Sequence, residues 1–512
     1  MCNPTETSTE EGESPAVEAA SSEPVAQVRH EDLDDSYGSS TGGAIFNFTN
    51  CIVGAGAIGL GGAFADSGGL ISVFTILFFA LLTKLSLDLV VIMSVEHSPT
   101  PQQRSASYEE LGYMAYGRMG RLAVLLSKFL YSFGCLVAYI IVVKDNFAPA
   151  LRHFLYGDNN NSHHNWFHQF LSGEGAQDTV TWVLGICVIL PLCLLRDMTP
   201  LSSLGAVSIA SMCSIVLIVL YIYCAEPDIR HEGEGTYQNW IQIRPGYVES
   251  WGTFVFTFVS QHTVNLAFES LRPEIRTVDT WKRVSSWSIS IATVISLTVG
   301  LVVYMTFWQD TRSDLFDMYP PLRIVDLAKL LLCVTMLLTF PLPFFSCREL
   351  LIVFFIQPLF AAAPSSQQLQ QQSTSLDDAL QEPLLDEETA ANEQDDDAED
   401  STSVIFEERP SRGCIPVMLP GEEKQLSLVY HVLLSTMFWG ASTYLAIVSP
   451  NLGDILDLVG SASGTAMAFV LPGLLSFKLQ GYTRLAAFIL VVGGAIGLVG
   501  TIFSFKKLIS DV

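Results

Sequence analysis

The sequence predicts an all-α integral membrane protein, because its apolar residues occur in long blocks and its charged residues are few. Of the 512 residues, 50% are hydrophobic and only 15% are charged, whereas soluble chains carry roughly a quarter of their residues charged. The apolar blocks are about 20 residues long, which is the helix length that crosses the ~30 Å hydrocarbon core of a bilayer. The alternation over about ten residues that marks membrane β-barrels does not occur in the sequence. These observations exclude a soluble enzyme and a disordered scaffold.

Eleven membrane spans are expected along the chain. The fourth contains Pro191, and the eighth is overlong and should kink at Pro341 and Pro343, since proline interrupts helical hydrogen bonding. The expected spans are 44–66, 69–95, 121–150, 179–195, 201–224, 251–270, 284–308, 324–357, 427–449, 454–477 and 483–505.

The net charge of −26 belongs mainly to two polar segments, because residues 1–40 contain ten acidic residues and 361–424 contain sixteen. Neither segment has enough apolar content to bury a core. The rest of the chain is close to neutral, so we expect no nucleic-acid partner. The predicted organisation is a disordered acidic cytoplasmic tail at 1–43, transmembrane helices 1–8 at 44–360, a disordered acidic cytoplasmic linker at 361–424, transmembrane helices 9–11 at 425–507 and a short C-terminal tail at 508–512.

Motifs of enzymes and metal sites do not occur in the sequence. The ten cysteines show neither CxxC nor the Cys/His spacing of a zinc site, and HExxH, GxSxG and GxxxxGK[ST] are absent. We therefore expect no enzymatic activity and no cofactor.

The orientation is predicted from the basic residues of the short loops. With a cytoplasmic N-terminus, the inward loops contain ten Lys and Arg, and the outward loops with the C-terminus contain eight. Asn160 opens an Asn-Asn-Ser sequon, a candidate glycosylation site that is modified only on the outer or lumenal side. The sequence does not distinguish the plasma membrane from a vacuolar or lysosomal membrane as the location of the protein. Four histidines are assigned to the same outer loop, where they are solvated or sense an acidic lumen: His153, His163, His164 and His168.

The first span contains a cluster of glycines in the segment NFTNCIVGAGAIGLGG. Glycine costs about 1 kcal/mol relative to alanine in a helix, so the helix can open at Gly54–Gly56 with a modest penalty. Backbone groups freed at this depth are tolerated only where they line a cavity or meet a ligand. The alternative reading is close helix packing through small residues, which we expect for Gly493 and Gly497 of the last span.

The sixth span is interrupted by a polar run, Ser260-Gln261-His262-Thr263-Val264-Asn265. Polar groups in hydrocarbon usually face the interior of the bundle. His262 is either a satisfied packing residue or a ligand or proton carrier, and Glu269 is either a gate contact or solvated at the interface.

Two interrupted helices, five spans apart, are typical of an inverted-repeat transporter. Spans 1–5 and 6–10 form the two repeats, and the eleventh is peripheral. The N-terminus of a half-helix favours an anionic group, whereas freed carbonyls and side-chain oxygens favour a cation. This combination suits a zwitterionic amino acid and a small cation.

The segment NFTNCIVGAGAIGLGGAFADSGG resembles the first helix of the sodium-coupled neutral amino acid transporters, in the amino acid/auxin permease superfamily. Further similar segments follow in the same order: YEELGYMAYG, VAYIIVVKDNF, VILPLCLLRDM and LTFPLPFFSCREL. The resemblance covers about 44–505. It implies a LeuT-like 5+5 inverted repeat that moves a small neutral amino acid by sodium symport and alternating access.

The resemblance also implies which residues form the sites. Sodium is the only metal ion that the resemblance implies, and it would be bound by Asn50 and Thr339. The substrate would be bound by Gly54, Ala55, Gly56, Tyr139, Ser260, Gln261 and His262.

Four departures from the family pattern leave the substrate range and regulation open. Thr263 stands where relatives have proline after the histidine, and Ala57 replaces a bulky aliphatic residue. Residues 144–178 contain no cysteine for the family's common loop disulfide, and the linker at 361–424 is longer than usual.

Two other functions remain as alternatives. In a proton-coupled vacuolar or lysosomal transporter, His262 or Asp88 would carry the proton, although Lys84 and Asp88 at i,i+4 can form a structural pair. An amino-acid sensor would signal through the acidic segments. The identity of the amino acid and the oligomeric state are not predicted.

Overall fold

A computed structural model describes residues 38–98, 105–157, 169–171, 173, 175–195, 204–351, 428–449 and 451–510. Within these ranges the secondary structure is helical, and the one β-type pairing is an isolated bridge between Ser39 and Leu271. Residues 1–37 of the acidic tail, the linker at 361–424, the sequon at Asn160 and three of the four loop histidines lie outside the described residues, whereas residues 41–43 of the predicted tail belong to the first helix.

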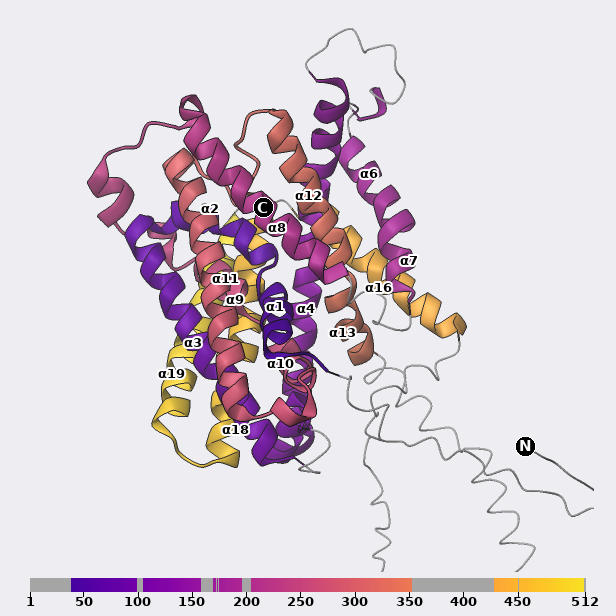
Figure 1. Ribbon diagram of the computed structural model, residues 1–512, viewed down its shortest axis with the longest axis vertical. Helices are drawn as coiled ribbons and strands as arrows, with labels where there is room; N and C mark the ends of the chain where they lie inside the picture. The colour runs from indigo at the N-terminus through magenta and orange to yellow at the C-terminus, as the bar shows by residue number, and fades with distance from the viewer. Residues whose placement is uncertain are drawn as a thin grey trace, which may run out of the picture. The chain divides into compact units, whose positions relative to one another are not determined.

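The helices follow one another through the whole described part of the chain (Figure 1). They are α1 (Thr41–Ile52), α2 (Ala55–Ser67), α3 (Gly69–Glu96), α4 (Tyr108–Tyr156), α6 (Ala176–Leu184), α7 (Leu190–Cys193), α8 (Leu204–Ala225), α9 (Trp251–Phe258), α10 (Val264–Glu269), α11 (Val278–Phe307), α12 (Arg323–Thr339), α13 (Pro341–Leu351), α16 (Leu428–Val448), α17 (Leu452–Val459), α18 (Leu471–Leu479) and α19 (Arg484–Ser510).

The expected membrane spans are present in the described part of the chain. Nine helical segments are long and apolar enough to cross a membrane, and α1 with α2 forms a tenth, bent span. The helices α9 and α10 have only eight and six residues, but with the break between them they occupy the expected sixth span. The protein is therefore an all-α, multi-pass membrane protein; nine or ten of its described helical segments qualify as spans by length and apolar character, and α9 with α10 is not among them.

The third span is preceded by a helical segment that the sequence did not predict: α4 begins at Tyr108, and the non-helical residues Tyr116 and Gly117 separate this first part from the part that begins close to the predicted residue 121. Ser107 accepts from the Glu110 amide and Glu110 accepts from the Ser107 amide, which forms a capping box. This cap starts a helix that the polar composition had placed in a loop. The helix bends at Tyr116 and Gly117, where Gly117 has φ 61°, a conformation that favours glycine.

The eighth span consists of two helices, α12 and α13, which meet at Phe340. Pro341 and Pro343 lack the amide hydrogen that a continuous helix requires, but Phe340 keeps helical φ/ψ values of −50° and −43° and Arg323–Arg348 forms one candidate span, so the kink expected at these prolines stays a prediction. The tenth span contains two π-helical stretches that the sequence did not predict, Gly460–Gly464 and Ala466–Val470. Such stretches are frequent at functional sites.

The long helix α4 is central to the packing, since α12, α13, α16 and α17 all contact it. Figure 1 shows α6, α7 and α16 on one side of α4, and α3 and α19 on the other. The helix α19 packs closely on the tenth span: a Cβ at Gly493 would collide with Phe469, and one at Gly497 would lie 3.1 Å from Thr465 Cγ2. The expected packing role of these two glycines is confirmed.

His153 does not lie in a solvated loop, which corrects the prediction. It belongs to the last turn of α4, and its Nδ1 contacts the carboxylate of Asp326 on α12. Asp326 is buried, with 3% of its surface exposed. The sequence could not reveal this contact, because the two residues are 173 positions apart.

Candidate functional site

The first break separates α1 from α2, whose axes meet at 53°. Val53 leaves the helical conformation with ψ 95° while its amide still donates to Thr49 O at 2.9 Å. Gly54 precedes α2 and provides no side-chain cap. The first amides of α2 therefore point out of the helix end without a capping side chain, which is the arrangement that binds anionic groups.

The glycines of this break allow two helices to approach at backbone distance. A Cβ at Gly56 would lie 2.5 Å from Thr257 Cα and 2.9 Å from Thr257 N, far inside normal contact. Thr257 lies near the C-terminus of α9, so the N-terminus of α2 adjoins the C-terminus of α9. A positive helix end thus lies beside a negative one.

Tyr139 of α4 reaches the same junction from the side. A Cβ at Gly54 would lie 3.3 Å from the Tyr139 hydroxyl, and the side chain of Thr339 lies near that hydroxyl. The predicted residues Gly54, Gly56, Tyr139 and Thr339 are thus brought together, although they come from three separate spans. We call this cluster, with Thr257, the junction.

The two predicted sodium ligands lie at different distances from the junction. Thr339 donates to Thr335 O at 2.8 Å, which leaves its oxygen lone pairs able to accept or to bind a cation. Asn50 lies one turn of α1 before the break, is half-buried, and forms no side-chain hydrogen bond with any described residue. Its amide oxygen is therefore unoccupied by the described protein groups.

The second break, between α9 and α10, is satisfied by the protein itself. The Tyr131 hydroxyl lies 3.2 Å from Phe256 O and 3.1 Å from Val259 O. The Ser260 amide donates to Gln261 Oε1 at 3.1 Å, and the Thr263 hydroxyl donates to Ser260 O at 3.0 Å. These contacts replace helical hydrogen bonds that the break removes.

The predicted sixth-span residues Gln261 and His262 differ in how fully the described residues satisfy their hydrogen bonds. Gln261 is 1% exposed, and besides accepting from Ser260 it donates to Ser86 on α3 at 3.5 Å. His262 packs against the Tyr131 ring with 5.4 Å between ring centroids. The buried Nδ1 of His262 has no hydrogen-bond partner among the described residues.

The two carboxylates predicted as gate or proton candidates have protein partners. Asp88 is paired with Lys84 at 2.8 Å and accepts from Ser285 on α11 at 2.7 Å. Glu269 accepts from the Ser105 hydroxyl at 2.9 Å, and Arg276 donates to its carbonyl at 2.8 Å. Asp88 therefore connects α3 to α11, and Glu269 connects the end of α10 to the segment before α4.

Sequence reasoning missed Tyr131, Thr257 and Cys51, whose side chain lies near Thr263. One signal was available: Tyr131, Cys135 and Tyr139 are spaced four residues apart and so share one face of α4. Thr257 carries no such signal, because it lies within an apolar run.

A second missed cluster lies at the start of α9. Asp457 on α17 accepts from the Thr253 amide at 3.0 Å and from the Thr253 hydroxyl at 2.6 Å. Lys507 on α19 lies 3.6 Å from Asp457 and 3.4 Å from Asp454. Asp457 therefore satisfies a first-turn amide of α9 and connects this half-helix to α17 and α19.

The loop at 311–322 covers the C-terminal half of α2. A Cβ at Gly62 would lie 2.8 Å from Ser313 Cα, so the loop contacts this helix directly. Beside it, Asp314 accepts from Asn146 Nδ2 at 2.6 Å and from the Phe316 amide at 3.1 Å. Burial raises the pKa of the Asp314 carboxyl, and these hydrogen bonds only partly oppose the rise.

Comparison with known proteins relates this arrangement to one family. A family model described as transmembrane amino acid transporter protein matches residues 37–509. Curated proteins from rat and cattle, both named "Putative sodium-coupled neutral amino acid transporter 11", are 27% identical over 314 and 309 residues. These matches cover 61% and 60% of this chain and 64% and 62% of the relatives. The chain thus spans less than two thirds of the length of these relatives.

Among solved structures, the chain is similar to the crystal structure of MhsT in complex with L-phenylalanine. The TM-score is 0.46 at 11% sequence identity, over 92% of this chain and 98% of that chain.

Proposed function

Because the chain belongs to the family of transmembrane amino acid transporter proteins, we propose that it carries a small neutral amino acid together with sodium, by alternating access. A member of this family is a transporter rather than an enzyme. The identification made from the sequence motifs is thereby confirmed at the level of the family. The substrate, the coupling ion and the alternating-access mechanism are the proposal.

The contact between Gly56 and Thr257 is the observation that carries this proposal. It sets the N-terminus of α2 beside the C-terminus of α9, so a carboxylate and an ammonium group could each meet a helix end of opposite sign. An α-amino acid has these two groups on neighbouring atoms. The uncapped amides of Ala55 and Gly56 would receive its carboxylate, and the carbonyls at the end of α9 would receive its ammonium.

The side chains at the junction favour a neutral substrate. Tyr139, Thr257 and Thr339 are all uncharged, so no side chain of the junction would compensate a charged substrate side chain. An unpaired charge in a low-dielectric interior is costly. A substrate with a small apolar or hydroxyl side chain avoids this cost.

Sodium would bind to neutral oxygens close to the junction. It is a hard cation that prefers amide, hydroxyl and carbonyl oxygens. Asn50 offers an amide oxygen without a described partner, and Thr339 offers a hydroxyl oxygen whose hydrogen is already donated to Thr335 O. Binding of sodium and substrate at the same helix break would couple the two solutes.

The test is uptake of labelled neutral amino acids into proteoliposomes under imposed sodium and pH gradients. We expect sodium-driven uptake in the unaltered protein. In Asn50→Ala and Thr339→Ala, the sodium concentration for half-maximal uptake should rise about tenfold, which is equivalent to about 1.4 kcal/mol. Thr298→Ala is the matched control, because Thr298 makes the same type of bond, to Val294 O, on an exposed face of α11. Equal sodium dependence in all three variants would refute the sodium site.

One observation favours proton coupling as the second candidate. The buried Nδ1 of His262 has no hydrogen-bond partner among the described residues, so it is available to bind a proton. Uptake driven by a pH gradient, insensitive to the two oxygen-ligand variants and lost in His262→Gln, would replace sodium symport with proton symport.

Deleting 361–424 separates transport from sensing. A transporter should retain its uptake after the deletion. A sensor that signals through the acidic segments should lose its signal and retain amino-acid binding.

A further inference from the structure

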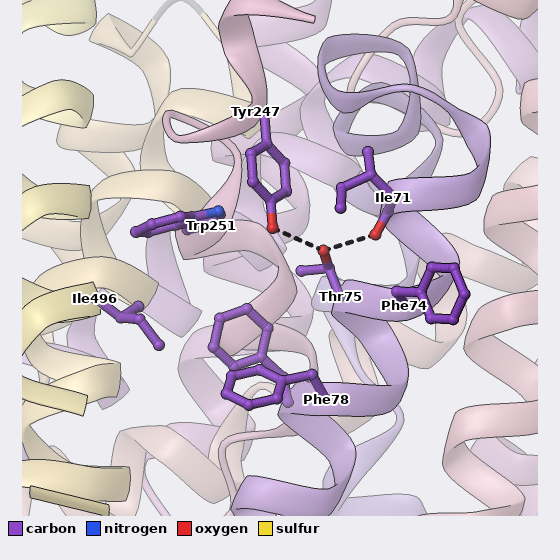
Figure 2. A pocket seen from close by; sticks show the side chains of 8 residues that line it. Ile71, Phe74, Thr75, Phe78, Tyr247, Trp251 and Ile496 are labelled. Carbon is purple, nitrogen blue, oxygen red and sulfur yellow. Dashed lines mark hydrogen bonds between the residues drawn. The ribbon is translucent and has the colours of Figure 1, made fainter. Parts of the chain in front are cut away.

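A groove between α3, α9 and α19 lies away from the junction and opens on the membrane-facing surface (Figure 2). It has a volume of about 190 Å³. Its lining residues are Ile71, Phe74, Thr75, Phe78, Phe79, Tyr247, Trp251 and Ile496. Phe74 and Phe78 are 60% and 39% exposed on a helix that qualifies as a membrane span, so the groove opens towards hydrocarbon.

The lining is apolar except at one end. Apolar cavities of roughly 150 Å³ stay dry and bind apolar molecules, so water does not suit this groove. Figure 2 shows the Thr75 and Tyr247 hydroxyls facing each other, with Phe78 and Ile496 further along the groove. The two hydroxyls thus lie with Ile71 and Trp251 at one end, called here the polar end, and Phe78, Phe79 and Ile496 form the wholly apolar other end.

The hydrogen bonds at the polar end leave one acceptor free. Thr75 Oγ1 lies 2.7 Å from Ile71 O and 3.1 Å from the Tyr247 hydroxyl. A carbonyl can only accept, so the single Thr75 hydrogen goes to Ile71 O. Tyr247 must then donate its own hydrogen to Thr75, and no described residue donates to the Tyr247 oxygen.

The same end also offers one free donor. The Trp251 indole packs edge-to-face on the Tyr247 ring with 5.6 Å between centroids, and its Nε1–H has no hydrogen bond to a described residue. In Figure 2 the indole nitrogen lies on the side of Trp251 that is nearer to Tyr247. One acceptor and one donor, on two side chains that pack against each other, match a hydroxyl group, which both donates and accepts.

The polar end lies close to the boundary of the membrane. Tyr247 ends the short helical turn Pro245–Tyr247 before α9, and Ile71 is in the first turn of α3. Tyrosine and tryptophan gather at this level in membrane proteins. The apolar part extends from there along α3, over about 10 Å between Ile71 and Phe78.

We propose that this groove binds a membrane sterol, with its hydroxyl between Tyr247 and Trp251 and its rings along Phe78, Phe79 and Ile496. A sterol has one hydroxyl at the interface and a rigid apolar body below it, which is the order of groups in the groove. A phospholipid acyl chain has no hydroxyl hydrogen to donate to Tyr247. A phospholipid headgroup is charged, and no charged side chain lines the groove among the described residues.

The experiment uses the purified full-length protein in phosphatidylcholine vesicles with a photoreactive cholesterol analogue. Cholesterol and its 3-ketone, which accepts but cannot donate a hydrogen bond, compete for labelling of peptides from α3, α9 and α19. We expect cholesterol to compete at a concentration about tenfold lower than the ketone. Equal competition by cholesterol, the ketone and excess phospholipid would overturn the proposal, because the groove would then be a crevice filled by any lipid.

Two variants sharpen the result. Tyr247→Phe removes the acceptor, so the preference for cholesterol over the ketone should fall to near parity, while Tyr221→Phe, on an exposed part of α8, should keep it. Ile496→Trp fills the apolar end and should abolish specific labelling. An unchanged elution profile in size-exclusion chromatography checks that each variant is folded. An unchanged sterol preference in folded Tyr247→Phe would refute the assigned hydroxyl position.

Discussion

The two helix breaks of this protein lie in the first and sixth spans, and they differ in how far protein groups satisfy their backbone hydrogen bonds. At the second break, Tyr131 contacts two carbonyls and Gln261 accepts from the Ser260 amide. At the first break, Gly54 provides no cap for α2. The protein thus satisfies one break internally and leaves amides available at the other.

The difference in hydrogen bonding indicates which break is rigid and which one needs a ligand. A break whose groups are satisfied by side chains needs no ligand to be stable in a membrane, whereas uncapped amides at this depth require a partner. The second break therefore presents a fixed helix end to the ammonium of the proposed substrate, and the uncapped amides of the first break receive its carboxylate. The contact of Gly56 with Thr257 holds the two breaks together.

The largest expected effect comes from Gly56→Ala, which would separate the two breaks. Its Cβ would lie 2.5 Å from Thr257 Cα, and a backbone atom cannot rotate away. Overpacking of this kind costs about 1–3 kcal/mol, so we expect uptake to fall by up to about 100-fold. Gly42→Ala on α1 is the control, because nothing lies within 4 Å of its added Cβ. Similar uptake in both variants would show that the close approach is dispensable.

Tyr131→Phe tests the satisfied break. It leaves Phe256 O and Val259 O without the hydroxyl donor, and a buried unsatisfied group costs about 1–3 kcal/mol. We expect a lower thermal unfolding temperature of the purified protein in detergent, with the affinity for substrate changed much less. A drop in substrate affinity at unchanged unfolding temperature would assign Tyr131 to the binding site instead.

Tyr139→Phe tests the open break and should give the reverse pattern. Its hydroxyl adjoins Gly54 and Thr339, and a neutral hydrogen bond contributes about 0.5–1.5 kcal/mol. We expect an increase of up to about tenfold in the substrate concentration for half-maximal uptake, at an unfolding temperature close to that of the unaltered protein. Destabilisation comparable to that of Tyr131→Phe would remove the contrast between the breaks.

The smallest effect is expected from Asp314→Asn, in the loop that covers α2. Burial raises the pKa of Asp314 above the usual value of about 3.9, so the folded state keeps a proton that the unfolded state has lost. The free energy of unfolding is then highest below about pH 4 and falls as pH rises through the raised pKa.

Asp314→Asn removes the carboxyl that titrates, so the unfolding temperature of this variant should decline less between pH 4 and pH 7. The difference in slope cannot exceed about 1.4 kcal/mol per pH unit for one proton. Asp317→Asn in the same loop, whose carboxylate is 46% exposed and paired with Arg312, is the matched control. Identical pH profiles for Asp314→Asn and the unaltered protein would contradict the assignment.

Much of the architecture was predictable because it depends on local properties of the chain. Blocks of about 20 apolar residues specify membrane spans, and a glycine cluster specifies the first break. The order of these features also identified the family. The polar residues beside the third span led to wrong predictions, because a loop was expected both where α4 begins at Tyr108 and at His153, which lies in the last turn of α4.

The tertiary structure decided which groups meet. Tyr131 lies 125 residues from Phe256, Thr253 lies 204 residues from Asp457, and Thr75 lies 172 residues from Tyr247. No periodicity encodes such pairs, because each depends on how whole helices rotate and cross once they pack. The sequence alone therefore determined that two helices break within the membrane, and packing determined that one break is closed by a tyrosine while the other stays open.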